Sequence, residues 1–252
     1  MSKALSKAQF SKALAVNLLA GAALAVASTP VRAADPVQPP PYVVAGMSGV
    51  SLTVVWDEAA IRKALPHGIQ PVKEMTGGIN IYSAERGYVI GPYSAAYFYV
   101  DIEGFDSPEG IKGRWMLAGA YGPENKTSAA LKEYFGLPVR PGTSQIQTTA
   151  DGKRAIGTVN GHDFITADFK PVPGPCQAGN ALLNYVALAP QAEQPQIAHI
   201  PFVGDSCKAE PVSAKITAPA GDPFAAFSIA KLTGASEFKN ASGAFAPPQP
   251  AK

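Results

Sequence analysis

Few residues in this 252-residue chain have the type and spacing that catalysis requires. Glu85 is the most interesting acid, because it lies between Tyr82 and Arg86 and next to the most strongly predicted strand. A carboxylate held in a pocket can act as a general acid or base. A solvated Glu85–Arg86 pair in a turn is the simpler alternative, and the residues alone leave both interpretations open.

The familiar motifs for nucleophilic, nucleotide and metal chemistry are missing from the sequence. It contains no GxSxG elbow, no GxGxxG fingerprint and no P-loop. The three histidines, His67, His162 and His199, stand apart from one another and from any cysteine pair. We therefore expect no metal centre and no organic cofactor.

The two cysteines, Cys176 and Cys207, admit a structural and a chemical interpretation. An exported protein would pair them in a disulfide that closes a loop of about thirty residues. A catalytic thiol or a metal site is the alternative, but two cysteines at this spacing without a nearby histidine cluster give it little support. The sequence favours the disulfide.

The N-terminus has the three parts of a secretory signal peptide. Lys3, Lys7 and Lys12 precede a small-residue apolar run at 13–27, and Val31 and Ala33 occupy the −3 and −1 positions of a cleavage site. A membrane anchor is the alternative, but fifteen apolar residues are short for a span of about 20. We predict cleavage after Ala33 and a periplasmic or secreted protein without a stable membrane span.

Charge and composition narrow the class of protein. Cleavage would remove four of the 21 basic residues and none of the 19 acidic ones, which leaves a net charge near −2. A nearly neutral chain fits a small-molecule ligand better than nucleic acid. A charged fraction of 16%, with 24 glycines and 24 prolines, excludes a coiled coil and indicates many turns and short strands.

The elements that must position these residues are mostly strands. The strongest is Tyr93–Ile102, whose aromatic residues suggest burial on both faces. Short helices are expected at 58–65, at 126–135 and after Asp222. About nine strands without a βαβ order predict an α+β domain, with a mostly antiparallel sheet that is curled or closed into a barrel. We divide the chain into a signal peptide (1–33), a Pro-rich leader (34–46), one domain (47–246) and a disordered tail (247–252).

The order of six segments resembles the acetoacetate decarboxylase superfamily from about Val50 to Phe245. The segments are VVWDEAAIRKALPHGIQPV, YSAE at 82–85, GPYSAAYFYVDIEG, GRW at 113–115, NYVALAP at 184–190 and DPFAAFSIAKLTGASEF. The resemblance implies a cone-shaped, mostly antiparallel β barrel with an apolar cavity and a few short flanking helices. It also implies Schiff-base chemistry, in which a cavity lysine attacks a β-keto acid that then loses CO₂. The family forms homo-oligomers, which is consistent with self-association here.

The sequence departs from the family at the catalytic positions. Decarboxylating members carry adjacent lysines after A-Y-P, whereas this chain reads AGAYGPENK, so Lys126 is the nearest amine. The family's N-terminal arginine would fall near Gly49, where no arginine stands. The resemblance implies Glu85 and Lys126 as catalytic residues. It implies a pocket lined by Tyr82, Arg114, Trp115 and Tyr121, with Trp115 in place of an acid.

Three functions follow as hypotheses. The first is an exported carbon–carbon lyase that uses Lys126 as a displaced amine and Glu85 as a proton shuttle. The second is a cavity protein that binds a keto acid or another small ligand without Schiff-base catalysis. The third is a structural barrel filled by its own side chains. A lone lysine keeps a pKa near 10.4 and is a poor nucleophile unless it is buried, so the missing lysine pair separates the first hypothesis from the others.

Overall fold

A computed structural model of the chain describes residues 37–123, 125–190, 192–219 and 221–251. The strands are β1 (Tyr42–Trp56), β2 (Thr76–Gly87), β3 (Tyr93–Ile102), β4 (Gly113–Gly122), β5 (Val139–Thr149), β6 (Gly152–Val159), β7 (His162–Pro171), β8 (Gln177–Ala187), β9 (Gln196–Ile216), β10 (Ile229–Phe245) and β11 (Gln249–Pro250). The helices are α1 (Glu58–Ala64), α2 (Asn125–Phe135) and the 3-10 helix η1 (Pro223–Ala226). The predicted signal peptide lies outside the described residues.

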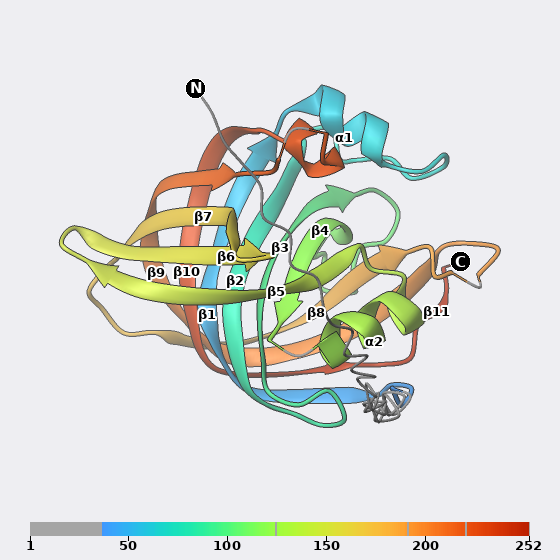
Figure 1. The fold of residues 1–252 in the computed structure, drawn as a ribbon, viewed down its shortest axis with the longest axis horizontal. Coiled ribbons are helices and arrows are strands. Elements are labelled where there is room, and N and C mark those ends of the chain that lie inside the picture. Colours follow the sequence, from blue (N-terminus) through green and yellow to red (C-terminus); the bar gives the residue numbers. More distant parts are fainter. Residues whose placement is uncertain (1–36, 124, 191, 220, 252) are drawn as a thin grey trace, which may run out of the picture. The chain divides into compact units, whose positions relative to one another are not determined.

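Nine of the strands in the described ranges close into a mixed barrel, in the order β10-β1-β2-β3-β4-β5-β6-β7-β9, with β9 paired back to β10 (Figure 1). All pairs on this path are antiparallel except β4 with β5. Strand β8 makes a second connection, because it pairs with β9 along its whole length and with β4 at two residues. The predicted α+β, mostly antiparallel barrel with short flanking helices is confirmed.

Local signals explain where the first helix begins and ends. The side chain of Asp57 accepts a hydrogen bond from the backbone N–H of Ala59 (3.2 Å), as an N-cap residue does. The helix buries Ile61 and stops at Leu65, directly before Pro66. Trp56, the last residue of β1, donates its indole N–H to the backbone oxygen of Tyr99 (2.9 Å) and so ties β1 to β3.

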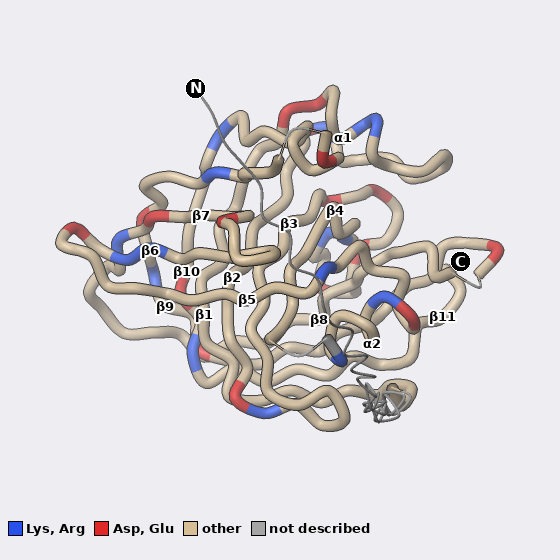
Figure 2. Tube along the Cα trace, viewed as in Figure 1, with Lys and Arg blue, Asp and Glu red and all other residues tan. Residues whose placement is uncertain are grey.

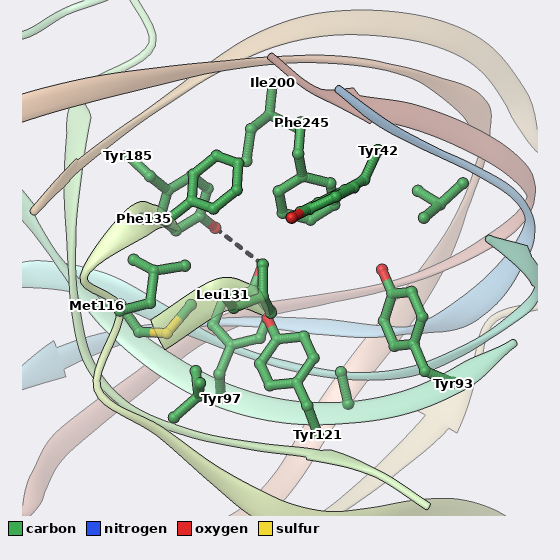
Figure 3. Close-up of a cluster of buried hydrophobic side chains, with 14 of the residues drawn as sticks. Tyr42, Tyr93, Tyr97, Met116, Tyr121, Leu131, Phe135, Tyr185, Ile200 and Phe245 are labelled. Carbon is green, nitrogen blue, oxygen red and sulfur yellow. Dashed lines mark hydrogen bonds between the residues drawn. The ribbon is translucent and has the colours of Figure 1, made fainter. Parts of the chain in front are cut away.

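Strand β3 is buried on both faces, as its aromatic sequence predicts. Its odd-numbered apolar side chains belong to one hydrophobic cluster and its even-numbered apolar side chains to another, because successive residues of a strand point to opposite faces. The first cluster, drawn in part in Figure 3, includes Tyr93, Tyr97 and Tyr99 and is covered by α2 and by β8 with the first half of β9. The second includes Phe98 and Val100 and is covered by β6, β7 and η1.

A disulfide joins Cys176 to Cys207, with the two Cα atoms 4.2 Å apart. It links the residue before β8 to the middle of β9, at the open end of the β8–β9 hairpin. A loop of this length stabilises the fold by about 3–4 kcal/mol in the chain-entropy account. The predicted structural bridge is confirmed.

Several boundaries differ from those expected from the sequence. Strand β1 begins at Tyr42, inside the range predicted as a leader, and Gln249 and Pro250 of the predicted disordered tail pair with β9. The sequence does not predict strands in the ranges of β4 and β10. In the part of the chain that the structure describes, no helix is long and apolar enough to cross a membrane. Figure 2 shows charges of both signs scattered along the chain rather than gathered in one patch.

Candidate functional site

A cavity of about 300 Å³ opens into the first hydrophobic cluster, between the inner face of β1–β4 and β10 and the β8–β9 hairpin. Its wall is mainly aliphatic and aromatic, as is usual for small-molecule sites. Figure 3 shows tyrosines from β3, β4 and β8 converging on this space. The apolar lining includes Val44, Met47, Ile200, Phe202, Phe238 and Phe245.

Arg114 is the cation in this wall. Its guanidinium lies 4.4 Å from the ring centroid of Tyr99, and its Nη1 donates to the hydroxyl of Tyr185 (3.3 Å). The Nε atom is buried and has no hydrogen-bond partner among the described residues. An arginine is always charged in proteins and has five N–H donors. Arg114 therefore presents an incompletely satisfied positive charge to the cavity.

The nearest acid by strand register does not neutralise Arg114 directly. Asp101 is its cross-strand partner, but the Asp101 carboxylate accepts the hydroxyl of Thr76 (2.7 Å). No ion pair between described residues includes Arg114. Burial raises the pKa of the Asp101 carboxyl, which the hydrogen bond from Thr76 and the charge of Arg114 oppose. Asp205, a carboxylate in the cavity lining, accepts a hydrogen bond from Asn240 (3.0 Å).

Two pairs of phenols supply neutral hydrogen-bond donors. The hydroxyls of Tyr97 and Tyr185 are 2.8 Å apart (Figure 3, dashed line), and those of Tyr82 and Tyr93 are 3.1 Å apart. Each phenol carries one hydrogen, so a pair joined by one hydrogen bond has one hydrogen left to donate. Within the first pair, that hydrogen lies beside Arg114, because Arg114 already donates to Tyr185.

A row of polar side chains crosses the cavity floor at the level of Tyr97. Strand register pairs Tyr97 with Asn80, Asn80 with Ser51, and Ser51 with Ser236. All four residues line the cavity. Asn80 is 8% exposed, and its amide makes no hydrogen bond to another described residue. The row therefore places an available amide close to the Tyr97–Tyr185 pair.

Burial of the tyrosines has a consequence for stability at alkaline pH. Desolvation raises the pKa well above its ordinary value for each of Tyr82, Tyr93, Tyr97, Tyr99 and Tyr121. The unfolded chain releases these protons at its ordinary tyrosine pKa near 10 and the folded chain does not. The free energy of unfolding is unaffected below that pH and falls as the pH rises above it, by up to about 1.4 kcal/mol per pH unit for each tyrosine.

Alkaline titration followed by near-ultraviolet absorbance and circular dichroism tests this expectation. The phenolate signal of the buried tyrosines should appear in one step, together with loss of the fold. Gradual ionisation of all nine tyrosines near pH 10, with the fold intact, would contradict it.

Three of the residues that the resemblance implies for the pocket line the cavity: Tyr82, Arg114 and Tyr121. Trp115 does not, because its side chain packs against the second cluster on the opposite face of β4. A β-bulge explains the difference. Tyr121 pairs with Ala95 and Met116 pairs with Tyr99, so one extra residue on β4 reverses which side chains face the cavity.

The two residues implied as catalytic lie away from the cavity. Glu85 is exposed on β2, on the side opposite the buried Ala84, and its side chain crosses over Gly46 of β1. Lys126 is exposed in the first turn of α2. The structure does not bring Glu85 and Lys126 together with Arg114, Tyr82 or Tyr121 around the cavity.

Lysines are absent from the described residues that line this cavity. A second, polar cavity of about 510 Å³ lies where β5 and β6 meet β1, β2 and β10, and it contains Lys153 and Lys239. The amine of Lys153 donates to the buried carboxylate of Glu237 (2.5 Å), and Lys239 is exposed. An ammonium group held in an ion pair has no electron pair with which to attack a carbonyl carbon.

Asn80, Tyr97 and Tyr185 belong to the site and were not identified as site residues from the sequence. Asn80 is the polar residue in the apolar stretch GINIYS, and Tyr185 follows Asn184 in NYVALA. A buried polar residue inside an apolar strand is the signal that points to such positions. The sequence does not show that they meet, because Tyr185 is 88 residues from Tyr97 and the register between β2 and β3 is set by their pairing.

Comparison with known proteins finds similarity in structure but not in sequence. No family model matches the chain, and no curated protein matches it. Solved structures do match. The acetoacetate decarboxylase from Legionella pneumophila has a TM-score of 0.70 at 15% identity, over 95% of this chain and 98% of that one.

Two further enzymes are also similar in structure. The enduracididine biosynthesis enzyme MppR, complexed with pyruvate, has a TM-score of 0.63 at 13% identity, over 85% of this chain and 91% of that one. An acetoacetate decarboxylase-like enzyme from Sphingomonas wittichii has a TM-score of 0.58 at 13% identity, over 86% of this chain and 94% of that one. The barrel, its strand order and these likenesses together establish that the chain has the acetoacetate decarboxylase-like fold.

Proposed function

We propose that this protein binds a small carboxylic acid of the keto-acid class in the cavity beside Arg114, and that it does so without forming a Schiff base. The observation that carries the proposal is the charged Arg114 in the wall of a mainly apolar cavity, where no ion pair between described residues neutralises it. A charge without a counter-ion in an apolar site costs free energy, and a carboxylate ligand would reduce that cost.

The surrounding donors suit a keto acid in particular. A guanidinium binds a carboxylate through two parallel N–H···O bonds. A neighbouring oxo group could then accept a hydrogen bond from the amide of Asn80 or from the spare phenol hydrogen of the Tyr97–Tyr185 pair. The complex of MppR with pyruvate supports this class, because it is a 2-oxo acid bound by a protein of the same fold.

The positions of the lysines support binding without imine chemistry. A Schiff base needs an unprotonated amine within reach of the ligand carbonyl. The described lining residues of the cavity include no lysine, Lys126 is exposed on α2, and Lys153 is paired with Glu237 in the other cavity.

We also propose that the protein is exported, with cleavage after Ala33, and acts in the periplasm or outside the cell. The Cys176–Cys207 disulfide supports this, because structural disulfides persist in oxidising compartments. Self-association into a homo-oligomer stays a prediction of the resemblance, and sedimentation of the mature protein would test it.

A binding titration with an imine trap tests the proposed function. The mature protein is titrated with pyruvate, acetoacetate and phenylpyruvate, and in parallel with their methyl esters, followed by calorimetry. The acids should bind and the esters should bind at least about tenfold more weakly, because an ester cannot form the charge-assisted pair with Arg114.

The trap separates binding from catalysis. Borohydride is added to the acid complexes, and any reduced adduct is located by peptide mass spectrometry. No lysine should be modified. A single modified lysine would restore the lyase hypothesis, and equal binding of acids and esters would remove Arg114 as the recognition group.

A further inference from the structure

The polar row on the cavity floor is continuous with Arg114. Arg114 donates to the hydroxyl of Tyr185 (3.3 Å), which lies 2.8 Å from the hydroxyl of Tyr97, the first residue of the row. The other residues of the row lie on adjacent strands, each paired in register with the one before it: Asn80, Ser51 and Ser236. Neighbouring strands are about 4.8 Å apart, so the row covers roughly 14 Å from Tyr97 to Ser236. The cavity therefore holds a cation and, next to it, a line of neutral hydrogen-bonding groups.

The alternation of side chains along the strands turns this row toward the cavity. Both neighbours of Tyr97, of Asn80 and of Ser51 in the sequence belong to the second hydrophobic cluster. Successive side chains of a strand point to opposite faces, so these three point to the face of the first cluster, where the cavity lies. Ser236 is the register partner of Ser51 and shares its face.

The protein leaves the polar groups beyond Tyr97 available to a ligand. The amide of Asn80 and the hydroxyls of Ser51 and Ser236 make no hydrogen bond to another described residue. The β8–β9 hairpin adds the hydroxyl of Ser206, which belongs to the cavity lining. Amides and hydroxyls can both donate and accept hydrogen bonds. Together they match a ligand that carries several hydroxyl groups.

The apolar part of the wall lies between polar groups rather than at a separate end. Ala198 of β9 is at the level of Arg114, and Ser206 of β9 pairs with Phe238. Phe202 is midway between Ala198 and Ser206, and its ring centroid is 5.8 Å from that of Phe238. A sugar ring or chain can contact such a wall with its C–H groups and the row with its hydroxyls. An alkyl chain over the row would leave an amide and two hydroxyls without partners, which costs free energy.

We infer that the ligand is a sugar acid, bound with its carboxylate at Arg114 and its hydroxyl groups along Asn80, Ser51 and Ser236. This inference rests on the proposed function and adds the hydroxyl groups to the keto acid. A volume of about 300 Å³ is at the lower limit of usual ligand sites, which suits one monosaccharide unit rather than an oligosaccharide.

Three ligands with matched carbon chains test the inference on the mature wild-type protein. 2-Keto-D-gluconate has a carboxylate and hydroxyl groups. 2-Oxohexanoate has the same number of carbons and the carboxylate but no hydroxyl groups, and D-fructose has the hydroxyl groups with CH₂OH in place of the carboxylate. In calorimetry, 2-keto-D-gluconate should bind at least about tenfold more tightly than either of the others. The reason is that only this ligand makes both the charge-assisted pair with Arg114 and the hydrogen bonds to the row.

A double variant of the row tests which residues recognise the hydroxyl groups. Ser51→Ala with Ser236→Ala should lower the preference for 2-keto-D-gluconate over 2-oxohexanoate by at least about fivefold. Both serines are partly buried and make no hydrogen bond to another described residue, so the double variant and the two single variants are expected to fold. Ser48→Ala makes the same change on β1 outside this cavity and should leave the preference unchanged.

The outcomes separate this inference from the proposed function. If 2-oxohexanoate or pyruvate binds as tightly as 2-keto-D-gluconate, or if the folded serine variants keep the full preference, the sugar acid is overturned and keto-acid binding stands. If D-fructose binds as tightly as 2-keto-D-gluconate, hydrogen bonding to the row is retained and recognition by Arg114 is overturned. If none of these ligands binds and no keto acid binds, the proposed function fails and the sugar acid fails with it.

Discussion

Replacing Arg114 by glutamine should weaken the binding of pyruvate or acetoacetate by about 10- to 100-fold, the usual worth of a hydrogen bond to a charged group. Glutamine keeps a donor and much of the side-chain length but removes the charge and the two-pronged geometry. The melting temperature should stay the same or rise, because the substitution removes a buried Nε without a partner among the described residues.

Two further variants serve as a control for R114Q and as a test of the opposite effect. Arg86→Gln makes the same chemical change at an exposed arginine of β2 outside the cavity and should leave the affinity unchanged. Asp101→Asn keeps an acceptor for the Thr76 hydroxyl but removes the negative charge opposite Arg114, so carboxylates should bind more tightly. An R114Q protein that binds keto acids normally, or that loses its fold, would show that Arg114 has a structural role instead.

Replacing Phe98 by alanine should lower the free energy of unfolding by about 3–5 kcal/mol, the range for a phenylalanine removed from a packed core. Phe98 is fully buried in the second cluster. Its ring lies 5.5 Å from that of Trp56, 5.8 Å from Phe164 and 5.4 Å from Phe227. The substitution therefore removes contacts between β1, β3, β7 and the segment after η1. The melting temperature should fall by roughly 6–20 °C.

Ligand binding should not change in the folded F98A protein, because Phe98 and the cavity lie on opposite faces of β3. Chemical denaturation measures the stability, and calorimetry with pyruvate below the melting temperature measures binding. Phe98→Leu serves as the control, since it keeps most of the volume and should cost less. A loss below about 1 kcal/mol for F98A, or weakened binding in the folded state, would contradict this division of β3 into two faces.

The sequence predicts the parts of the fold that depend on the type and spacing of the residues within one segment or one cysteine pair. The aromatic and β-branched residues of Tyr93–Ile102 predict a doubly buried strand, and β3 is one. Asp57 and Pro66 predict the limits of the first helix within a residue or two. The cysteine pair predicts the disulfide, because few other roles suit two isolated cysteines in a chain that is predicted to be exported.

Strands β4 and β10 could not be predicted in the same way. Their sequences, GRWMLAGAYG and IAKLTGASEFKNASGAF, are rich in glycine, alanine and polar residues that have little preference for strands. Both lie between two partners: β10 pairs with β1 and β9, and β4 pairs with β3 on one side and with β5 and β8 on the other. Hydrogen bonds to neighbours distant in sequence, rather than local preference, hold them as strands.

The candidate site likewise has a part that the sequence predicts and a part that depends on the pairing of distant strands. The sequence by itself determined which groups are available: one arginine beside an aromatic strand, many tyrosines, and no paired lysines after Tyr121. Only the tertiary structure decided which of them meet. Strand register brings Asn80 level with Tyr97, and the β-bulge of β4 turns Arg114 rather than Trp115 toward the cavity. The reason is that side chains alternate along a strand, so one extra residue exchanges the two faces, and the bulge depends on pairing with β3 rather than on β4 alone.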